Sequence, residues 1–191
     1  TGFKYIAEKI AEFELSGEHS YLFGYEESYG YLIETFVRDK DAVQVALKVA
    51  EMAAYYTVQG KTLLHALDEL YEQYGYYQEA LVSKMFEGKD GQEQMQTILN
   101  SYREKLPTEI ADVAVVRVED YLTGVATQHD GRRETILLPR ENVLKFILED
   151  QSWIAIRPSG TEPKCKFYFG VVKGSKEQAT EAINRLKQYF A

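Results

Sequence analysis

Residues 157–163, which we call the Arg157 loop, concentrate groups that bind anions. Arg157 supplies a planar guanidinium fork suited to phosphate oxygens, and Ser159 and Thr161 supply hydroxyl donors. Gly160 lets backbone N–H groups approach a ligand closely, while two of the chain's four prolines stiffen the loop. This set of donors predicts an anion-binding nest, although a rigid hairpin with a solvated arginine has the same composition.

The charge of the whole chain opposes such a site. Thirty acidic and 22 basic side chains give a formal net charge of −8 over 191 residues. An acidic surface disfavours general binding to nucleic acids and to anionic membranes. Phosphate affinity must therefore come from a local cluster of cations. Lys164 and Lys166 add positive potential to the loop, unless the alternation of side chains along a strand turns them away from it.

A second segment, residues 24–30, carries carboxylates and hydroxyls between two glycines, and we call it the Glu26 loop. In an extended segment Glu26 and Glu27 point to opposite faces, so one carboxylate is free to face a ligand. Glu26 with the hydroxyl of Ser28 can accept from, and donate to, neighbouring hydroxyls of a sugar. A solvated acidic turn is the alternative. No metal site is expected, since no further ligand stands at a suitable spacing.

Other single residues are less specific. Lys40 lies between Asp39 and Asp41, where a helix cap is the first interpretation and proton transfer by Lys40 the second. The lone Cys165 cannot form an internal disulfide, which fits a reducing cytoplasm. No apolar run approaches the roughly 20 residues that a membrane span needs, so no membrane partner is expected.

The elements that position the Glu26 loop are predicted from periodicity and capping. Apolar residues at helical spacing predict a helix over residues 3–15, and residues 21–23 predict a short buried strand. Asp39 or Asp41 begins a second helix with an apolar stripe, and Gly60 ends it. A third helix runs from Thr62 to Gly75, with leucines and tyrosines on its inner side.

The character of the chain changes after Tyr76. One helix is expected before Pro107, and β-branched and aromatic residues then predict strands at 113–118, 135–138, 144–148, 152–156 and 166–172. Ser175 and Gln178 form a capping-box pattern that opens a last helix. We therefore expect two domains, at residues 1–76 and 77–191. The first is helix-rich, and the second is an α+β domain with a mostly antiparallel sheet and two helices.

Three segments in order carry a resemblance to a known family. They are the Glu26 loop (Gly-Tyr-Glu-Glu-Ser-Tyr-Gly), residues 38–42 (Arg-Asp-Lys-Asp-Ala) and the Arg157 loop (Arg-Pro-Ser-Gly-Thr-Glu-Pro). Together they resemble the α-D-phosphohexomutases, the phosphoglucomutase/phosphomannomutase family, and most closely its phosphoglucomutase-type branch. Family members have four domains around one cleft. The resemblance implies that residues 1–76 are the C-terminal part of domain three, an α/β remnant, and that residues 77–191 are domain four.

The resemblance also implies roles for individual residues. Glu26 and Ser28 would contact sugar hydroxyls. The phosphate that is not being transferred would be held by four residues of the Arg157 loop, namely Arg157, Ser159, Gly160 and Thr161. Thr1, Gly2 and Lys4 resemble a further substrate loop, and Lys40 resembles a lysine proposed to assist proton transfer. Tyr25 departs from the pattern, because many members have glycine directly before the first glutamate.

The activity implied is the interconversion of hexose 1-phosphate and hexose 6-phosphate through a 1,6-bisphosphate and an enzyme phosphoserine. The implied cofactors of the parent enzyme are Mg²⁺ and glucose 1,6-bisphosphate, and its implied location is the cytoplasm. The sequence lacks the family's serine loop and its Asp-x-Asp-x-Asp metal loop, so we expect a C-terminal segment that is inactive alone, binds no metal itself and has the missing N-terminal domains as partners. The alternative is a free-standing phosphosugar-binding module without catalysis. Both loops recognise features that glucose and mannose share.

Overall fold

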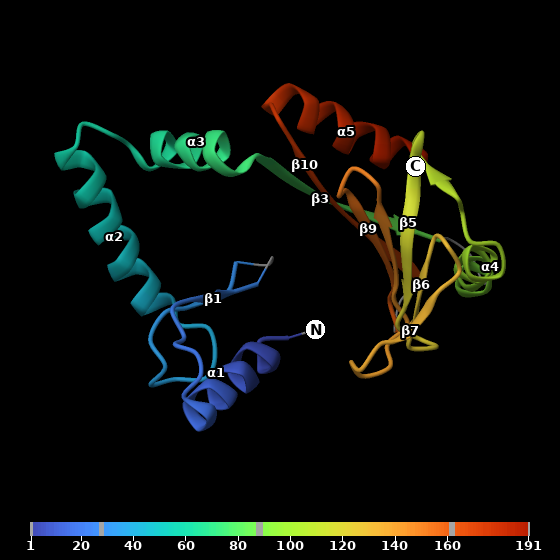
Figure 1. The fold of residues 1–191 in the computed structure, drawn as a ribbon, viewed down its shortest axis with the longest axis horizontal. Helices are drawn as coiled ribbons and strands as arrows, with labels where there is room; N and C mark the ends of the chain where they lie inside the picture. The colour runs from blue at the N-terminus through green and yellow to red at the C-terminus, as the bar shows by residue number, and fades with distance from the viewer. Residues whose placement is uncertain (1, 27–28, 87–89, 161–162, 191) are drawn as a thin grey trace. The chain divides into compact units, whose positions relative to one another are not determined.

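The computed structural model describes residues 2–26, 29–86, 90–160 and 163–190. The chain folds into two compact units, Thr1–Glu69 and Leu70–Ala191, which are described one at a time (Figure 1). Within the described residues, no helix combines the length and the apolar character needed to cross a membrane.

The first unit begins with helix α1 (Lys4–Ser16), which confirms the helix expected from the apolar spacing. Ile10 of this helix is fully buried in a small core with Phe3 and Leu32. Gly17 ends the helix in the left-handed conformation, with φ of 67°, where its N–H donates to the carbonyl of Phe13.

A short hairpin follows, in which strand β1 (Gly24–Tyr25) pairs antiparallel with strand β2 (Tyr31–Leu32). The strand expected over residues 21–23 is wrong. Leu22 is 82% exposed, and pairing starts only at Gly24.

The reason lies in the packing beneath Gly24. A Cβ at this position would come within 2.6 Å of Ile6 Cγ2 and 2.7 Å of the Tyr21 hydroxyl. Tyr21 uses that hydroxyl to donate to the carbonyl of Leu32 at 2.8 Å. Tyr21 therefore packs against Gly24 and hydrogen-bonds to Leu32, and so supports the hairpin without being one of its strand residues.

Helix α2 (Ala42–Val58) begins at Asp41, whose carboxylate accepts from the N–H groups of Val43 and Gln44. This confirms Asp41 as the cap. The apolar stripe that we expected to be buried is instead open, because no residue of α2 is buried and its members Val43 and Leu47 are 79% and 64% exposed. Periodicity predicted which residues share a face of the helix, but the described residues of this unit do not bury that face.

Helix α3 (Leu63–Tyr74) has a reciprocal cap at its start. The Thr62 hydroxyl accepts from the His65 N–H at 3.2 Å, and His65 Nδ1 accepts from the Thr62 N–H at 3.3 Å. Only Ala66 of this helix is buried, so the inner side that we expected is wrong for its exposed members, Leu67, Leu70 and Tyr74.

The second unit is an antiparallel sheet in the order β3-β10-β9-β8-β5-β6-β7, with β4 pairing the start of β5. The strands are β3 (Tyr76–Met85), β4 (Glu109–Ile110), β5 (Val113–Asp120), β6 (Val125–Gln128), β7 (Arg133–Thr135), β8 (Leu144–Leu148), β9 (Trp153–Pro158) and β10 (Lys164–Lys173). Two helices complete the unit, α4 (Gly91–Glu104) and α5 (Lys176–Tyr189).

One face of this sheet carries the main core of the second unit. Residues of α4 and α5 pack with the alternate, buried residues of β8, β9 and β10. The inner face expected for α5 is confirmed, since all five of its predicted members are buried, namely Ala179, Ala182, Ile183, Leu186 and Phe190. The start of α5 predicted from Ser175 and Gln178 is also confirmed, because Ser175 Oγ accepts from the Gln178 N–H. The α+β fold of this part of the chain therefore matches the expectation.

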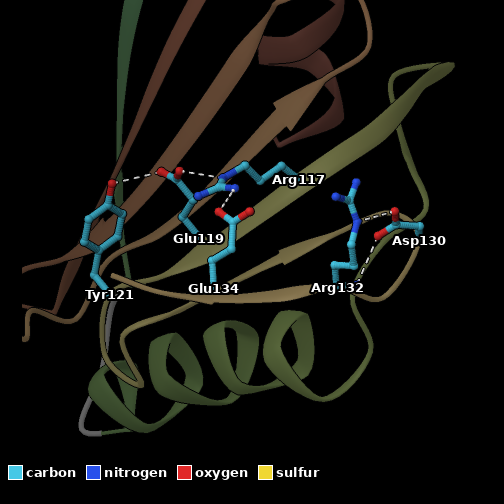
Figure 2. A network of polar contacts seen from close by, with 6 residues as sticks. All are labelled: Arg117, Glu119, Tyr121, Asp130, Arg132 and Glu134. Carbon is cyan, nitrogen blue, oxygen red and sulfur yellow. Dashed lines mark hydrogen bonds and ion pairs between the residues drawn. The ribbon is translucent and has the colours of Figure 1, made fainter. Parts of the chain in front are cut away.

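The edge of the sheet was predicted less well. The strand expected over 135–138 is instead β7, which ends at Thr135, and the short strands β4 and β6 were missed. Figure 2 shows what holds this edge: Arg117 donates to Glu119 at 2.9 Å and to Glu134 of β7 at 2.6 Å. Tyr121 donates to Glu119 at 2.9 Å, and burial together with this bond raises the pKa of Tyr121 to about 12. The ion pair between Arg117 and Glu134 thus reinforces the backbone pairing of β7 with β6, although all three residues of β7 are exposed.

Truncating the core of the second unit should destabilise it strongly. Phe146 of β8 is fully buried, and we expect Phe146→Ala to lower the free energy of unfolding by about 3–5 kcal/mol, because it leaves a cavity. Leu137→Ala, at a position 95% exposed, should change it by less than about 0.5 kcal/mol. Urea denaturation followed through Trp153, the chain's single tryptophan, measures both. Equal effects would contradict this assignment of the core.

Candidate functional site

The Arg157 loop joins the end of β9 to the start of β10. The Ser159 N–H donates to the carbonyl of Lys164 at 2.7 Å, which closes the loop across its base. The Phe86 N–H donates to the carbonyl of Pro163 at 2.8 Å, so the end of β3 supports the loop from the other side. Gly160 is exposed, as an anion-binding backbone requires. The predicted contributor Thr161 lies outside the described residues.

The register of β9 and β10 brings cations together beside this loop. Arg157 lies directly opposite Lys166, and Lys164 lies two residues before Lys166 on the same strand. In an antiparallel pair, opposite residues share a face and so do residues two apart. The alternation that we considered as a reason for the lysines to turn away therefore places both on the face of Arg157. Lys166 is the residue that motif reasoning undervalued, and strand pairing is the signal that identifies it.

These three cations lack carboxylate partners among the residues that the structure describes, and all three are half-buried. Like charges directly opposite each other in a sheet repel and destabilise the pair. A bound anion would relieve that repulsion and accept hydrogen bonds from the same groups. The geometry is therefore that of an anion site on a chain whose net charge is negative.

The Glu26 loop forms the tip of the hairpin in the first unit. The Glu26 N–H donates to the carbonyl of Gly30 at 2.8 Å, which continues the pairing of Tyr25 with Tyr31. Tyr29 has φ of 66°, an uncommon conformation for a residue with a side chain, and it turns the chain back toward β2. Ser28, the predicted sugar contact, lies outside the described residues.

Lys40, which is distant from Glu26 in the sequence, lies close to it beside Gly30. A Cβ on Gly30 would overlap the Cγ and Cδ atoms of Lys40 and would lie 3.0 Å from Glu26 Oε2. Lys40 and the Glu26 carboxylate therefore occupy the same side of Gly30. Lys40 Nζ also donates to Asp39 Oδ1 at 2.8 Å. That hydrogen bond, with the charges of Asp39 and Glu26, raises the pKa of Lys40. Lys40 is thus a cation at neutral pH.

Near the start of the chain, the ring of Phe3 lies beside Lys40, whereas Lys4 lies beside the ring of Tyr5. Lys40 Nζ lies 5.3 Å from the centre of the Phe3 ring, which is 4% exposed. Lys4 is exposed, and its Nζ lies 5.1 Å from the centre of the Tyr5 ring. Gly2 is exposed with φ of 116°, and Thr1 lies outside the described residues. Sequence reasoning missed Phe3 and Gly30, whose roles follow only from packing.

The described residues contain no group of three or more His, Cys, Asp or Glu side chains placed to hold a metal ion.

Residues 1–74 match the family model for phosphoglucomutase/phosphomannomutase, alpha/beta/alpha domain III, and residues 99–187 match the model for phosphoglucomutase/phosphomannomutase, C-terminal domain. The chain belongs to the phosphoglucomutase/phosphomannomutase family. The resemblance inferred from the three motifs is confirmed.

Several curated relatives in this family are named phosphoglucomutase. One from Staphylococcus haemolyticus is 43% identical over 183 residues, and one from Staphylococcus epidermidis is 41% identical over 185 residues. These alignments cover 95% and 96% of this chain but 33% of each relative. The chain therefore spans about a third of the length of the phosphoglucomutases that it matches.

A solved structure supports the same fold. It is the open form of the exocytosis-sensitive phosphoprotein pp63/parafusin from Paramecium, described as a phosphoglucomutase. The match has a TM-score of 0.61 at 16% sequence identity and covers 99% of this chain and 32% of that one. The fold class expected from the sequence is thus that of a family member.

The cation cluster predicts a response to inorganic phosphate. Titration with phosphate should shift the amide NMR signals of Ser159 and Gly160, and the shifts should weaken as ionic strength rises, because salt screens exposed charges over about 8 Å at 0.15 M. Lys166→Ala should reduce the affinity. Lys84→Ala is the matched control, because Lys84 pairs with the buried Cys165 and so takes the other face. Equal losses in the two variants would contradict the site.

Proposed function

We propose that this chain is the sugar- and phosphate-recognition segment of an intramolecular phosphotransferase of the phosphoglucomutase type. The parent enzyme would interconvert hexose 1-phosphate and hexose 6-phosphate through a 1,6-bisphosphate and an enzyme phosphoserine. The observation that carries the proposal is the cation cluster beside the Arg157 loop, which has no carboxylate partner among the residues that the structure describes, in a member of this family. The assignment of residues 1–76 to domain three and 77–191 to domain four belongs to the same proposal.

In this proposal the Arg157 loop holds the phosphate that is not being transferred. Arg157 would donate two parallel N–H bonds to phosphate oxygens. Ser159, Gly160 and Thr161 would donate from hydroxyl and backbone N–H groups, and Lys166 would add a point charge beside the fork. The Glu26 loop would hold the sugar, with Glu26 accepting from ring hydroxyls and Ser28 donating to them.

Phosphoryl transfer depends on positioning and on stabilising charge, because the protein does little covalent chemistry on the phosphate itself. The bisphosphate must turn over between two half-reactions. A recognition segment can serve both orientations if it contacts features present in each, which are equatorial hydroxyls and one distal phosphate. Neither loop needs to move a proton for this task.

The phosphoserine, the Mg²⁺ and the N-terminal domains are proposed for the parent enzyme. The sequence holds no match to the family's serine or metal loop, and the described residues do not fit a metal ion. No catalytic step is therefore assigned to a metal bound by this chain. The chain's single cysteine, Cys165, is free and buried, which fits the reducing conditions of the proposed cytoplasmic location.

Removing the guanidinium should weaken phosphosugar binding. We expect Arg157→Ala to raise the Kd for glucose 1,6-bisphosphate by about 10- to 100-fold, because a charge-assisted hydrogen bond contributes about 1.5–3 kcal/mol. Arg157→Lys should recover part of the loss, since it restores charge without the fork. Calorimetric titration measures the constants, with Arg133→Ala on exposed β7 as control. Binding of equal strength in wild type and Arg157→Ala would refute the assignment.

The same proposal predicts that the 191-residue chain alone does not turn over glucose 1-phosphate. A coupled assay for glucose 6-phosphate, on protein purified free of any full-length mutase, should show no activity above the background without protein. The reason is that no serine nucleophile loop is present to carry the phosphoryl group. Sustained turnover with added Mg²⁺ would disprove it.

A further inference from the structure

We propose that Lys40 is a positioning residue for the Glu26 carboxylate, and that it acts through its aliphatic stem packed against Gly30. This inference rests on the proposed function, in which Glu26 accepts from sugar hydroxyls. It differs from the proton-transfer role that the family resemblance implies for Lys40.

The contact at Gly30 is the first part of the argument. The Cγ and Cδ atoms of Lys40 occupy the place that a Cβ at position 30 would take, and Glu26 Oε2 borders the same place. Gly30 is buried although it lies in a hairpin loop. The stem of Lys40 and the Glu26 carboxylate are therefore neighbours on this side of Gly30, and we infer that the stem limits where the carboxylate can lie.

The ammonium group is held separately from the stem. Its hydrogen bond to Asp39 at 2.8 Å and its position 5.3 Å from the centre of the Phe3 ring fix the end of the side chain. When the ammonium group of a lysine is held, its stem stays in one conformation. A lysine whose ammonium is free samples several conformations about its four rotatable bonds.

The backbone that carries Lys40 is fixed to the hairpin as well. The Asp41 N–H donates to the carbonyl of Tyr31 at 3.0 Å, and the Asp41 carboxylate caps α2. From the first turn of α2, Gln44 Oε1 accepts from the N–H groups of Ile33 and Glu34 at 3.2 and 2.8 Å. The start of α2 is thus hydrogen-bonded to the end of the hairpin, and the backbone of Lys40 directly precedes these bonds.

A comparison of three variants tests whether the stem or the charge matters. Lys40→Ala removes the stem, Lys40→Met keeps most of it without charge, and Gly30→Ala displaces it while keeping the charge. We expect Lys40→Ala and Gly30→Ala each to raise the Kd for glucose 1,6-bisphosphate about tenfold, because a misplaced binding group loses its geometry. Lys40→Met should stay within about threefold of wild type. Lys48→Ala, at a lysine of α2 that also has an acidic partner, is the control.

A double-mutant cycle shows whether Lys40 acts through Glu26. If it does, Lys40→Ala should have little further effect in a Glu26→Gln background, whereas independent effects would add. Additive losses, with Lys40→Met as weak as Lys40→Ala, would mean that the ammonium acts on the ligand directly and would overturn the inference. Amide NMR spectra establish that each variant is folded. If Lys40→Ala does not fold, the comparison of Lys40→Met with Gly30→Ala still shows whether the stem or the charge matters.

The Arg157→Ala variant separates the two proposals. If it weakens binding while the Lys40 and Glu26 effects are additive, only the positioning role fails. If the wild-type chain binds no glucose 1,6-bisphosphate, or binds it with no dependence on Arg157, the proposed function itself fails.

Discussion

The register between β9 and β10 is the constraint on which the anion site depends. Because side chains alternate along a strand, burying Cys165, Phe167 and Phe169 in the core places the intervening residues on the opposite face. Alternation puts Arg157 and Lys166 on the same face, and the register makes them direct neighbours. A slip of one residue would bring charges into the core and move aromatic rings out of it. The core that stabilises the second unit therefore also aligns the cations beside the loop.

The first unit positions its loop by a different device. Its hairpin has only two pairs of residues, too few to be stable without support from other elements. Support comes from side chains that occupy the space above two glycines: Ile6 and Tyr21 at Gly24, and Lys40 at Gly30. Here glycine is required for close packing rather than for an unusual backbone angle, because neither residue has a positive φ.

Strand register and close packing at glycines mark the limit of what could be predicted from the sequence. Caps at Asp41 and Ser175 and the inner face of α5 follow from local patterns, and the structure confirms them. The exposed stripe of α2 shows that periodicity defines a face without showing what covers it. The pairing of Arg157 with Lys166, and the contact of Lys40 with Gly30, join residues whose relation depends on register and packing. The motifs located both loops, whereas the residues that support them required coordinates.

The cation cluster differs from most other half-buried cations of the second unit in its lack of acid partners among the described residues. Three other half-buried cations are matched by acids, because Arg103 pairs with Asp120, Arg117 with two glutamates, and Lys173 with Asp150. Half-buried Lys145 lies over the ring of Trp153 instead. Hydrogen bonds from Lys173 and Ser152 outweigh the effect of partial burial and lower the pKa of Asp150, which keeps that carboxylate charged at neutral pH. In a chain with eight more acids than bases, a neutralising carboxylate for Arg157 and Lys166 would be easy to supply. Among the described residues these cations have no such partner, which has an electrostatic cost in the free protein, and in the proposed function the bound phosphate removes that cost.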